Sequence, residues 1–281
     1  MNKFKVFFTF FAFLWLWLCG IGAIAQCFHA RELAWLGVLM NAWALPIWML
    51  MRFLSPQKYA GDLRESPAFF AVLAGLAIAL LADAERGWPV YLSIYNLFIA
   101  LLYLHHFSAV AHPQMPQIDE QFPDLMLLEQ DAPDKSALWS AAEHCEGENS
   151  PGLLVIFLRG PFCADSRRCL AQIESQRAAF HHRGVDISVF SVSGSRWPLS
   201  CRQQGGLPPV STLDTGATEN HLFIAPGAAP LWAWGWQCDA VRPSYWLVDK
   251  EGYIVWRALP GNYRALPSLS SIRDQLYRLE E

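Results

Sequence analysis

Long apolar runs fill the first 110 residues of the chain. A membrane-spanning helix needs about 20 apolar residues, with a tolerance down to about 17. There are four such runs, at residues 4–25, Leu33–Leu54, Pro67–Ala82 and Trp88–Val110. The first, second and fourth are long enough to span a membrane, and the third is marginal. Pro46 lies inside the second run, where it predicts a kink. The pattern predicts an all-α membrane domain of about four transmembrane helices over residues 1–110.

The first run has a second interpretation as a secretory signal. Ala23-Ile24-Ala25 resembles a small-residue cleavage site. The apolar part is, however, longer than the roughly 7–15 residues that such a signal needs, so we favour an uncleaved helix.

Lysine and arginine residues in the short loops predict the orientation of these helices. One side carries Lys3, Lys5, Arg52, Lys58 and Arg64, and the other carries only Arg31 and Arg86. The first side is therefore expected to be cytoplasmic. Four crossings return the C-terminal domain to the cytoplasm, whereas three or five would place it in the periplasm. We expect an integral protein of a bacterial inner membrane.

The pattern changes after residue 110. Residues 111–125 are rich in proline and acidic side chains, which predicts an extended linker. Residues 126–281 then form a second domain. Near its start, residues 134–143 predict one short helix, and Cys145 lies in a polar turn where we expect it to be exposed.

Two apolar runs flank a helical segment in the second domain. Leu153–Leu158 is short and bounded by glycines, which predicts a buried strand. A helix is expected from Cys163 to about His182, followed by a strand over Val185–Val192. Strand, helix and strand at this spacing predict a βαβ unit with a parallel pair.

The C-terminal end predicts a hairpin and a closing helix. Tyr245–Val248 and Tyr253–Arg257 are strands joined by a tight turn, and Pro267–Glu280 carries an apolar stripe at helical spacing. Upstream, residues 221–236 contain three alternating tryptophans. That segment is either an apolar docking surface or part of the core. At 53% hydrophobic residues the whole chain is too apolar for one ordinary soluble domain.

Cys163 is the main candidate for chemistry. It lies between the end of a buried strand and the start of a helix, where unpaired N–H groups and the helix dipole favour the thiolate. Arg159, Arg167 and Arg168 add positive potential, and Asp165 opposes it. The alternative is a small buried core cysteine.

The stretch FLRGPFCADSRRCL, residues 157–170, resembles the F-x-R-G-x-W-C-P-x-C-R-x-x-L motif of thioredoxin-fold proteins of the alkyl hydroperoxide reductase/thiol-specific antioxidant (peroxiredoxin-like) family. The aromatic position is Phe162, and the identical positions are Arg159, Gly160, Cys163, Arg167 and Leu170. The resemblance covers roughly the last 160 residues. It implies an α/β thioredoxin-like domain behind the membrane helices.

The resemblance also implies roles for single residues. Cys163 would be the nucleophile with Arg159 beside it, and Pro243, directly before the strand at Tyr245, would be cis and face Cys163. Ser166 stands where the motif has its second cysteine, so the usual two-thiol chemistry lacks its partner. Gly160 stands where peroxiredoxins have a threonine or serine, which argues against efficient peroxide reduction.

Three other cysteines are candidate resolving thiols. Cys169 lies six positions after Cys163, about 9 Å along a helix, beyond the roughly 7 Å Cα limit for a disulfide unless the first turn unwinds. Cys201 and Cys238 are the other two, and they can equally pair with each other or stay free.

Two classes of function remain. One is a membrane-anchored thiol–disulfide oxidoreductase that forms a mixed disulfide with a partner through Cys163. The other is a redox-inactive binding or assembly subunit of a membrane complex. Apart from the adjacent His181 and His182, the sequence shows no spacing typical of zinc ligands. We expect no cofactor, no metal and no nucleic-acid partner; the expected partners are the lipid bilayer and a protein thiol or disulfide.

Overall fold

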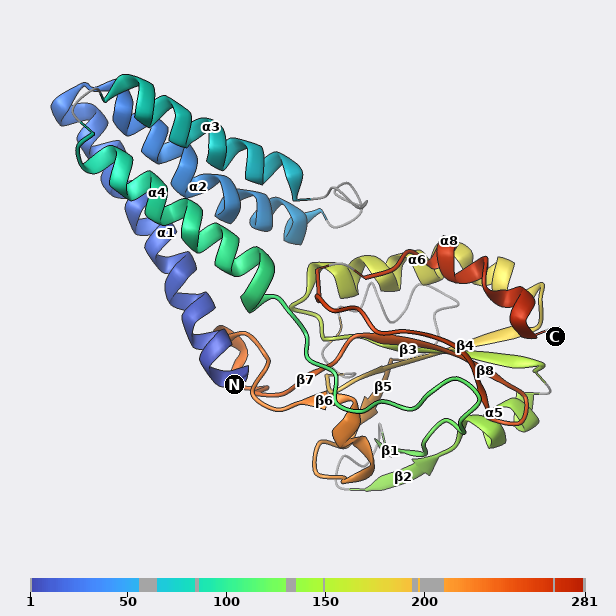
Figure 1. Cartoon of the computed structure of the whole chain (residues 1–281). Helices are drawn as coiled ribbons and strands as arrows, with labels where there is room; N and C mark the ends of the chain where they lie inside the picture. Colours follow the sequence, from blue (N-terminus) through green and yellow to red (C-terminus); the bar gives the residue numbers. More distant parts are fainter. Residues whose placement is uncertain are drawn as a thin grey trace. The chain divides into compact units, whose positions relative to one another are not determined.

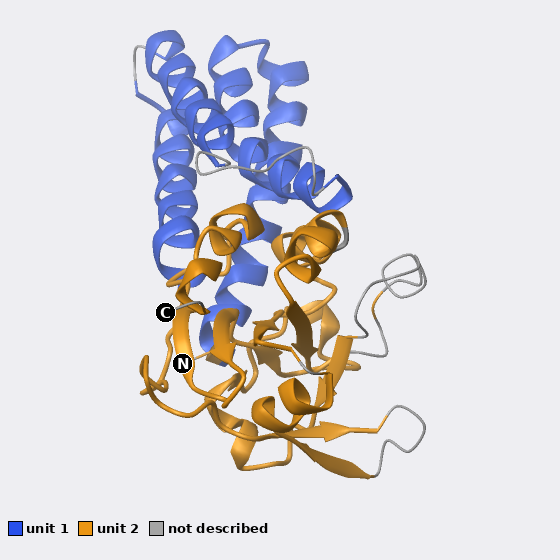
Figure 2. Cartoon of the chain, turned by 90° about the vertical axis from the view of Figure 1, so that its right-hand side faces the viewer, with its two compact units in different colours: residues 1, 3–109 blue, residues 2, 110–281 orange. Residues whose placement is uncertain are grey.

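The computed structural model describes residues 2–55, 65–83, 86–129, 135–148, 150–193, 197, 210–264 and 266–279. The chain divides into two compact units (Figure 2). Lys3–Ala109 form a helical unit and Val110–Glu281 form a sheet unit.

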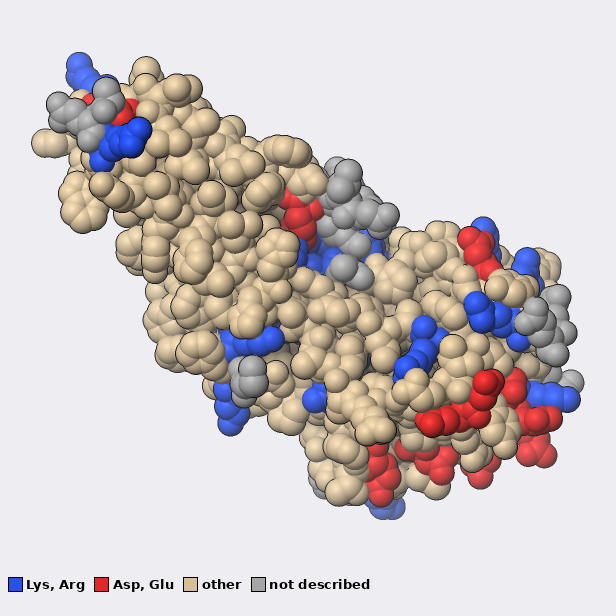
Figure 3. Space-filling model, viewed as in Figure 1, with Lys and Arg blue, Asp and Glu red and all other residues tan. Residues whose placement is uncertain are grey.

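The described residues of the helical unit form four helices: α1 (Asn2–Ala30), α2 (Leu33–Leu54), α3 (Ser66–Ala82) and α4 (Trp88–Leu102), the last continued by a π-helical turn, η1 (Tyr103–Phe107). Three of these stretches are long and apolar enough to cross a membrane: Asn2–Ala30, Leu33–Leu54 and Trp88–Phe107. The 17-residue α3 is apolar but shorter. On the face seen in Figure 3, charged side chains of this unit lie at its two ends and the band between them is uncharged.

Small residues bring α2 and α3 into close contact along their length (Figure 1). A Cβ added at Gly37 of α2 would lie 2.6 Å from the backbone oxygen of Gly75 and the backbone nitrogen of Ala79 in α3. At the other end, Arg52 of α2 forms an ion pair with Glu65, directly before α3. The start of α2 therefore faces the end of α3, so the two helices are antiparallel, and only small residues at this seam allow the approach.

A seven-stranded sheet forms the centre of the sheet unit (Figure 1). The strands are β1 (Leu125–Leu128), β2 (Ser136–Trp139), β3 (Gly152–Phe157), β4 (Val185–Ser191), β5 (Val210–Leu213), β8 (Ser244–Asp249) and β9 (Ile254–Ala258), in the order β2-β1-β5-β4-β3-β8-β9. Strands β3, β4 and β5 are parallel, and the remaining pairs are antiparallel. The predicted βαβ unit and C-terminal hairpin are confirmed.

Helices cover both faces of this sheet. Helix α6 (Ala164–His181) packs on one face together with α8 (Leu269–Arg273) and the 3-10 turn η5 (Leu276–Leu279), and α5 (Ala141–Glu148) lies on the other. Alternate residues of β3 point to the two cores: Leu154 and Ile156 to the α6 side, and Leu153, Val155 and Phe157 to the α5 side. The unit thus has the mixed α/β arrangement expected of a thioredoxin-like fold.

Residues 110–124 belong to the sheet unit and pack on it. Met115 and Phe122 are buried in the core on the α5 side. The Asp119 N–H donates to the Ile254 carbonyl, and the Ile254 N–H donates to the Glu120 carbonyl. The segment that reads as a linker therefore covers the outer edge of β9, which would otherwise present unpaired backbone groups.

Two local predictions near the start of the domain were wrong. Residues 134–143 do not form one helix, because Ser136–Trp139 pairs with β1 and only Ala141 begins a helix. Cys145 is buried and not exposed, because it lies one turn after Ala141 on the face of α5 that packs against the sheet. Residues 221–236 form short turns and the two-residue strand β6 (Ile224–Ala225), which pairs with β7 (Ala240–Val241).

Candidate functional site

Cys163 lies at the junction between β3 and α6. It is the N-cap of α6, with extended dihedral angles of φ −99° and ψ 119°. Its N–H donates to the Gly160 carbonyl at 3.1 Å, and its carbonyl accepts from the Arg167 N–H at 3.1 Å. Gly160 has φ +147°, a conformation open to glycine, which turns the chain into the helix. Only 5% of Cys163 is exposed.

Ser166 fills the position of the second motif cysteine and is completely buried. Its Oγ accepts a hydrogen bond from the backbone N–H of Arg159 at 3.1 Å. This bond ties the first turn of α6 back to the end of β3. Ser166 therefore has a structural function that holds the loop around Cys163.

Arg159 links the segments around the cysteine. Its Nη2 donates to the Ala228 carbonyl at 2.7 Å. The guanidinium carbon lies 4.0 Å from the ring centroid of Tyr263 and 5.4 Å from that of Phe162, which are cation–π distances. One side chain thus connects the loop before α6 with two segments that follow much later in the chain.

An aromatic cap, defined as Ala228–Trp236 with Phe162 and Tyr263, covers Cys163. The buried members of this cluster are Phe162, Cys163, Ala229, Ala233 and Ala240, and Trp234, Trp236 and Tyr263 pack against them. The Trp232 ring meets the Phe162 ring edge-on at 6.4 Å, and 60% of Trp232 is exposed. The tryptophan-rich segment therefore contributes both to the core above Cys163 and to the surface.

Two charged side chains are buried next to the cysteine. Asp165 and Arg168 lie on the first turns of α6, with the carboxylate Oδ1 3.7 Å from the guanidinium Nη2. Their charges oppose each other. The pair therefore adds little net potential to the loop.

Cys169 is buried in the core between α6 and the sheet, apart from the cap. The Tyr245 hydroxyl donates to its Sγ at 3.5 Å. Burial raises the pKa of the Cys169 thiol to about 11, with the Tyr245 bond and Arg168 opposing that shift only in part. Because the thiolate is the nucleophile, Cys169 is a poor resolving residue at neutral pH.

Cys238 is exposed and follows directly after the cap. Its Sγ donates to the Trp234 carbonyl at 3.6 Å, and its own carbonyl accepts from the Ala229 N–H at 3.0 Å. Of the described candidate resolving thiols, Cys238 is thus bonded to cap residues and Cys169 is not. Cys201 lies outside the described residues.

The prediction of a cis bond at Pro243 was wrong, because the peptide bond before Pro243 is trans. An X–Pro bond prefers trans by about 0.5–1 kcal/mol unless its surroundings oppose it. Here Arg242 is held on the preceding side by an N–H bond to the Phe223 carbonyl at 2.7 Å. The register of β3 with β8 pairs Phe157 with Ser244, so Pro243 lies at the same end of the sheet as Cys163. Contact between the two residues stays a prediction.

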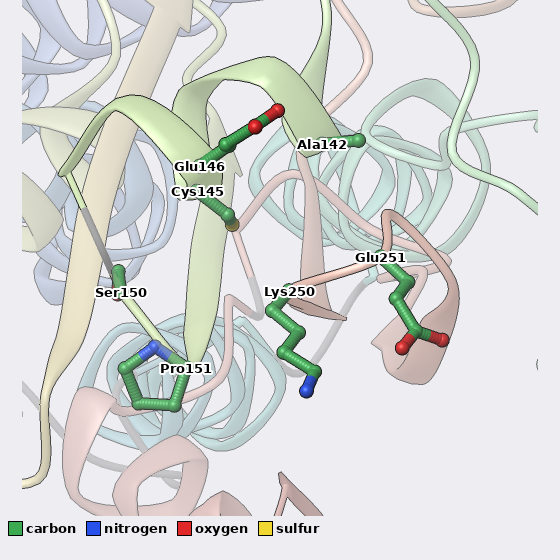
Figure 4. A pocket seen from close by; sticks show the side chains of 7 residues that line it. All are labelled: Ala142, Cys145, Glu146, Ser150, Pro151, Lys250 and Glu251. Carbon is green, nitrogen blue, oxygen red and sulfur yellow. The ribbon is translucent and has the colours of Figure 1, made fainter.

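A hollow of about 620 Å³ lies at the other end of β3 (Figure 4). It is lined by Ala142, Cys145, Glu146, Ser150, Pro151, Lys250 and Glu251. Burial raises the pKa of Cys145 to about 11, with smaller contributions from Asp186 and Asp249, so this thiol stays protonated at neutral pH. In the described part of the chain, no group of three or more His, Cys, Asp or Glu residues is placed to hold a metal ion.

Comparisons with known proteins give structural matches only. No family profile matches the chain, and no curated protein matches its sequence. A thiol peroxidase from Chromobacterium violaceum is 15% identical, with 61% of this chain and 92% of that chain covered and a TM-score of 0.42. A peroxiredoxin-like protein from Aquifex aeolicus is 11% identical over 61% and 92%, with a TM-score of 0.43. A mutant of peroxiredoxin 6 of Arenicola marina is 12% identical over 59% and 74%, with a TM-score of 0.47. Identities this low transfer no residue role to this chain.

Proposed function

We propose that this protein is a membrane-anchored, peroxiredoxin-like thiol–disulfide oxidoreductase that acts through Cys163. The observation that carries the proposal is the position of this cysteine as the N-cap of α6, directly after the buried central strand β3. The N-terminus of α6 carries positive potential, and the Arg159 guanidinium lies against Phe162 and Tyr263, which pack around this cysteine.

The reaction uses a single thiol in its first step. The Cys163 thiolate attacks one sulfur of a partner disulfide, a mixed disulfide forms, and the other partner sulfur leaves as a thiolate. A second thiolate, from an external thiol or from Cys238, then attacks the Cys163 sulfur and releases the second partner thiol. The partner gains two electrons, and Cys163 ends in a disulfide with the attacking thiol.

A redox-inactive binding or assembly subunit is the second candidate. The observation that favours it is the burial of Cys163, 5% exposed beneath the aromatic cap, together with the structural hydrogen bond of Ser166. In that function Cys163 would be a core residue and the cap surface would bind the partner.

Trapping of a mixed disulfide separates the two candidates. The full-length protein is purified in detergent, treated with glutathione disulfide, and measured by intact mass. In a Cys238→Ser background, we expect a stable adduct that is lost when Cys163→Ser is added and kept when the matched control Cys169→Ser is added. If no adduct depends on Cys163, even after mild warming to open the cap, the oxidoreductase proposal is wrong.

We further propose that α3 crosses the bilayer, which makes four crossings in total. The support is its antiparallel contact with α2, which reaches from Gly37 at one end to the Arg52–Glu65 ion pair at the other. At about 1.5 Å per residue, 17 residues reach roughly 26 Å, a little less than the hydrocarbon core of about 30 Å. The sheet unit then lies on the cytoplasmic side of a bacterial inner membrane. A reporter fused after Glu281 should report the same side as one fused before Lys3; opposite sides would exclude the fourth crossing.

A further inference from the structure

The aromatic cap carries the most exposed large apolar side chain found in the described part of the sheet unit. Five such side chains are at least 44% exposed there, and Trp232 leads with 60%. The Trp232 ring packs against two other rings, with centroid distances of 6.4 Å to Phe162 and 6.3 Å to Trp236. Trp232 and the partly buried Trp236 therefore form one aromatic surface that an interfacial partner can contact.

The first residues of the sheet unit lie at the end of the sheet that carries the aromatic cap. The Val110 N–H donates to the Gly261 carbonyl at 2.9 Å, and the His112 ring bonds the Pro260 carbonyl at 3.0 Å. One residue away, the Ala111 carbonyl accepts from Arg242 Nε at 3.2 Å. These bonds fix the entering chain to the residues that follow β9 and precede β8.

Strand register shows that Cys163 also lies at this end of the sheet. Ser244, at the start of β8, pairs with Phe157 at the end of β3. The next residue, Tyr245, pairs with Ala258 at the end of β9. Tyr263, two residues after Gly261, stacks on Arg159 in the cap. The entry point of the chain and the cap are therefore at one end of the sheet.

The tether from the membrane to this edge is short. The last apolar stretch able to span ends at Phe107, and Val110, three residues later, is already bonded into the sheet unit. A fully extended chain reaches at most about 3.6 Å per residue, so the tether spans roughly 11 Å. The interfacial layer of a bilayer has a thickness of the same order, since headgroups add about 10–15 Å to the hydrocarbon core in total.

We propose that the occupant of the cap surface is the bilayer itself, with Trp232 inserted at the headgroup level. Tryptophan and tyrosine are enriched at this level of membranes because their rings are apolar and carry one polar group. The cap supplies Trp232, Trp236 and Tyr263 from segments held together by Arg159. This proposal rests on the membrane-anchoring part of the proposed function and is independent of Cys163 reactivity.

The consequence concerns the class of substrate. A thiol beneath a cap that lies on the membrane meets disulfides carried close to the bilayer surface before it meets those dissolved in the cytoplasm. The partner is then expected to be a membrane protein with a cystine near the headgroup level.

Lipid quenching at matched positions tests the proposal. A fluorescent amino acid is introduced by codon suppression at Trp232 or, as control, at Leu138, which is equally exposed at 59% but lies on the edge strand β2. The full-length protein is reconstituted into phosphatidylcholine–phosphatidylglycerol vesicles containing headgroup-proximal doxyl lipid. We expect at least threefold stronger quenching by lipid at position 232 than at 138, and the reverse order with iodide in solution.

The outcomes separate this proposal from the function on which it rests. If both positions are quenched by iodide and neither by doxyl lipid, the cap does not contact the membrane and the proposal is wrong, whatever Cys163 does. Repeating the measurement in Cys163→Ser should change nothing, because the contact requires no redox step. If alkaline carbonate extracts the full chain from vesicles, the anchoring is wrong and this proposal fails with it.

Discussion

Ser166→Cys should convert the site from one thiol to two. The native Ser166 Oγ is buried and accepts a hydrogen bond from the Arg159 N–H, so the surrounding structure fixes the position of the side chain at residue 166. Residues three apart on a helix have Cβ atoms about 5–6 Å apart, which a small shift brings within the roughly 4.5 Å limit for a disulfide. The new thiol can therefore attack the mixed disulfide at Cys163 and release the bound partner thiol.

The size of the effect follows from effective concentration. A thiol on a short flexible connection has an effective concentration in the mM range, and a thiol fixed on the same helical turn is at least as favourable. Against 0.1 mM external glutathione, the adduct lifetime should fall by about tenfold or more. The assay is the decay of the glutathione adduct, followed by intact mass after removal of excess disulfide.

Ser166→Ala is the matched control. It removes the acceptor of the Arg159 N–H without adding a thiol, so it should lower the free energy of unfolding by about 1 kcal/mol and leave the adduct lifetime unchanged. If the adduct decays equally slowly in Ser166→Cys and in the native protein, the first turn of α6 does not place residue 166 within reach of the cysteine.

Three further predictions concern stability. Burial lowers the pKa of His112, so the unfolded chain binds a proton before the folded chain does as pH falls below about 6.5. The free energy of unfolding, and with it the midpoint urea concentration, should therefore fall as pH falls. The variant His112→Gln should show a weaker dependence of this midpoint on pH between about 7.5 and 5.5. Cys169→Ala leaves the buried Tyr245 hydroxyl without its partner and should cost about 1–3 kcal/mol, whereas Tyr245→Phe should cost less and a double variant less than the sum, measured by chemical unfolding. Gly37→Ala places a Cβ 2.6 Å from backbone atoms of α3 and should lower the thermal stability seen by size-exclusion chromatography, while Gly22→Ala, with open space, should not.

The central part of the fold was predictable because its signals are local. The run Leu153–Leu158 is apolar without interruption, as a strand buried on both faces must be, and glycines bound it. The alternating Val185–Ser191 and the tight turn before Tyr253 gave the parallel pair and the hairpin in the same way. Each of these elements needs little information from elsewhere in the chain.

The wrong predictions concern residues whose state depends on distant partners. Ser136–Trp139 has no strong strand pattern and becomes a strand because β1 pairs with it. Cys145 looked exposed in a polar stretch, but α5 turns it toward the sheet. The trans bond at Pro243 departs from an expectation based on resemblance alone.

The same division applies to the candidate site. The positions of Cys163 and Arg159 follow from the strand and helix boundaries, and both could be named from the sequence. The partners of Arg159 could not, because the Ala228 carbonyl and the Tyr263 ring come from segments about 70 and 100 residues further along. The structural use of Ser166 was equally hidden, since its bond partner is a backbone N–H that no side-chain pattern reports.

The environments of the described cysteines in the sheet unit restrict how the site can complete a reaction. Cys145 and Cys169 lie in two separate cores, and burial raises the pKa of each to about 11, so neither supplies a thiolate at neutral pH. Cys238 is exposed and bonded to the cap, and Cys163 lies beneath that cap. Under the proposed function, an event that lifts the cap would expose Cys163 and would also move Cys238, which is bonded to the cap. The proposed reaction therefore requires the cap to open before a substrate disulfide can reach Cys163, which is only 5% exposed.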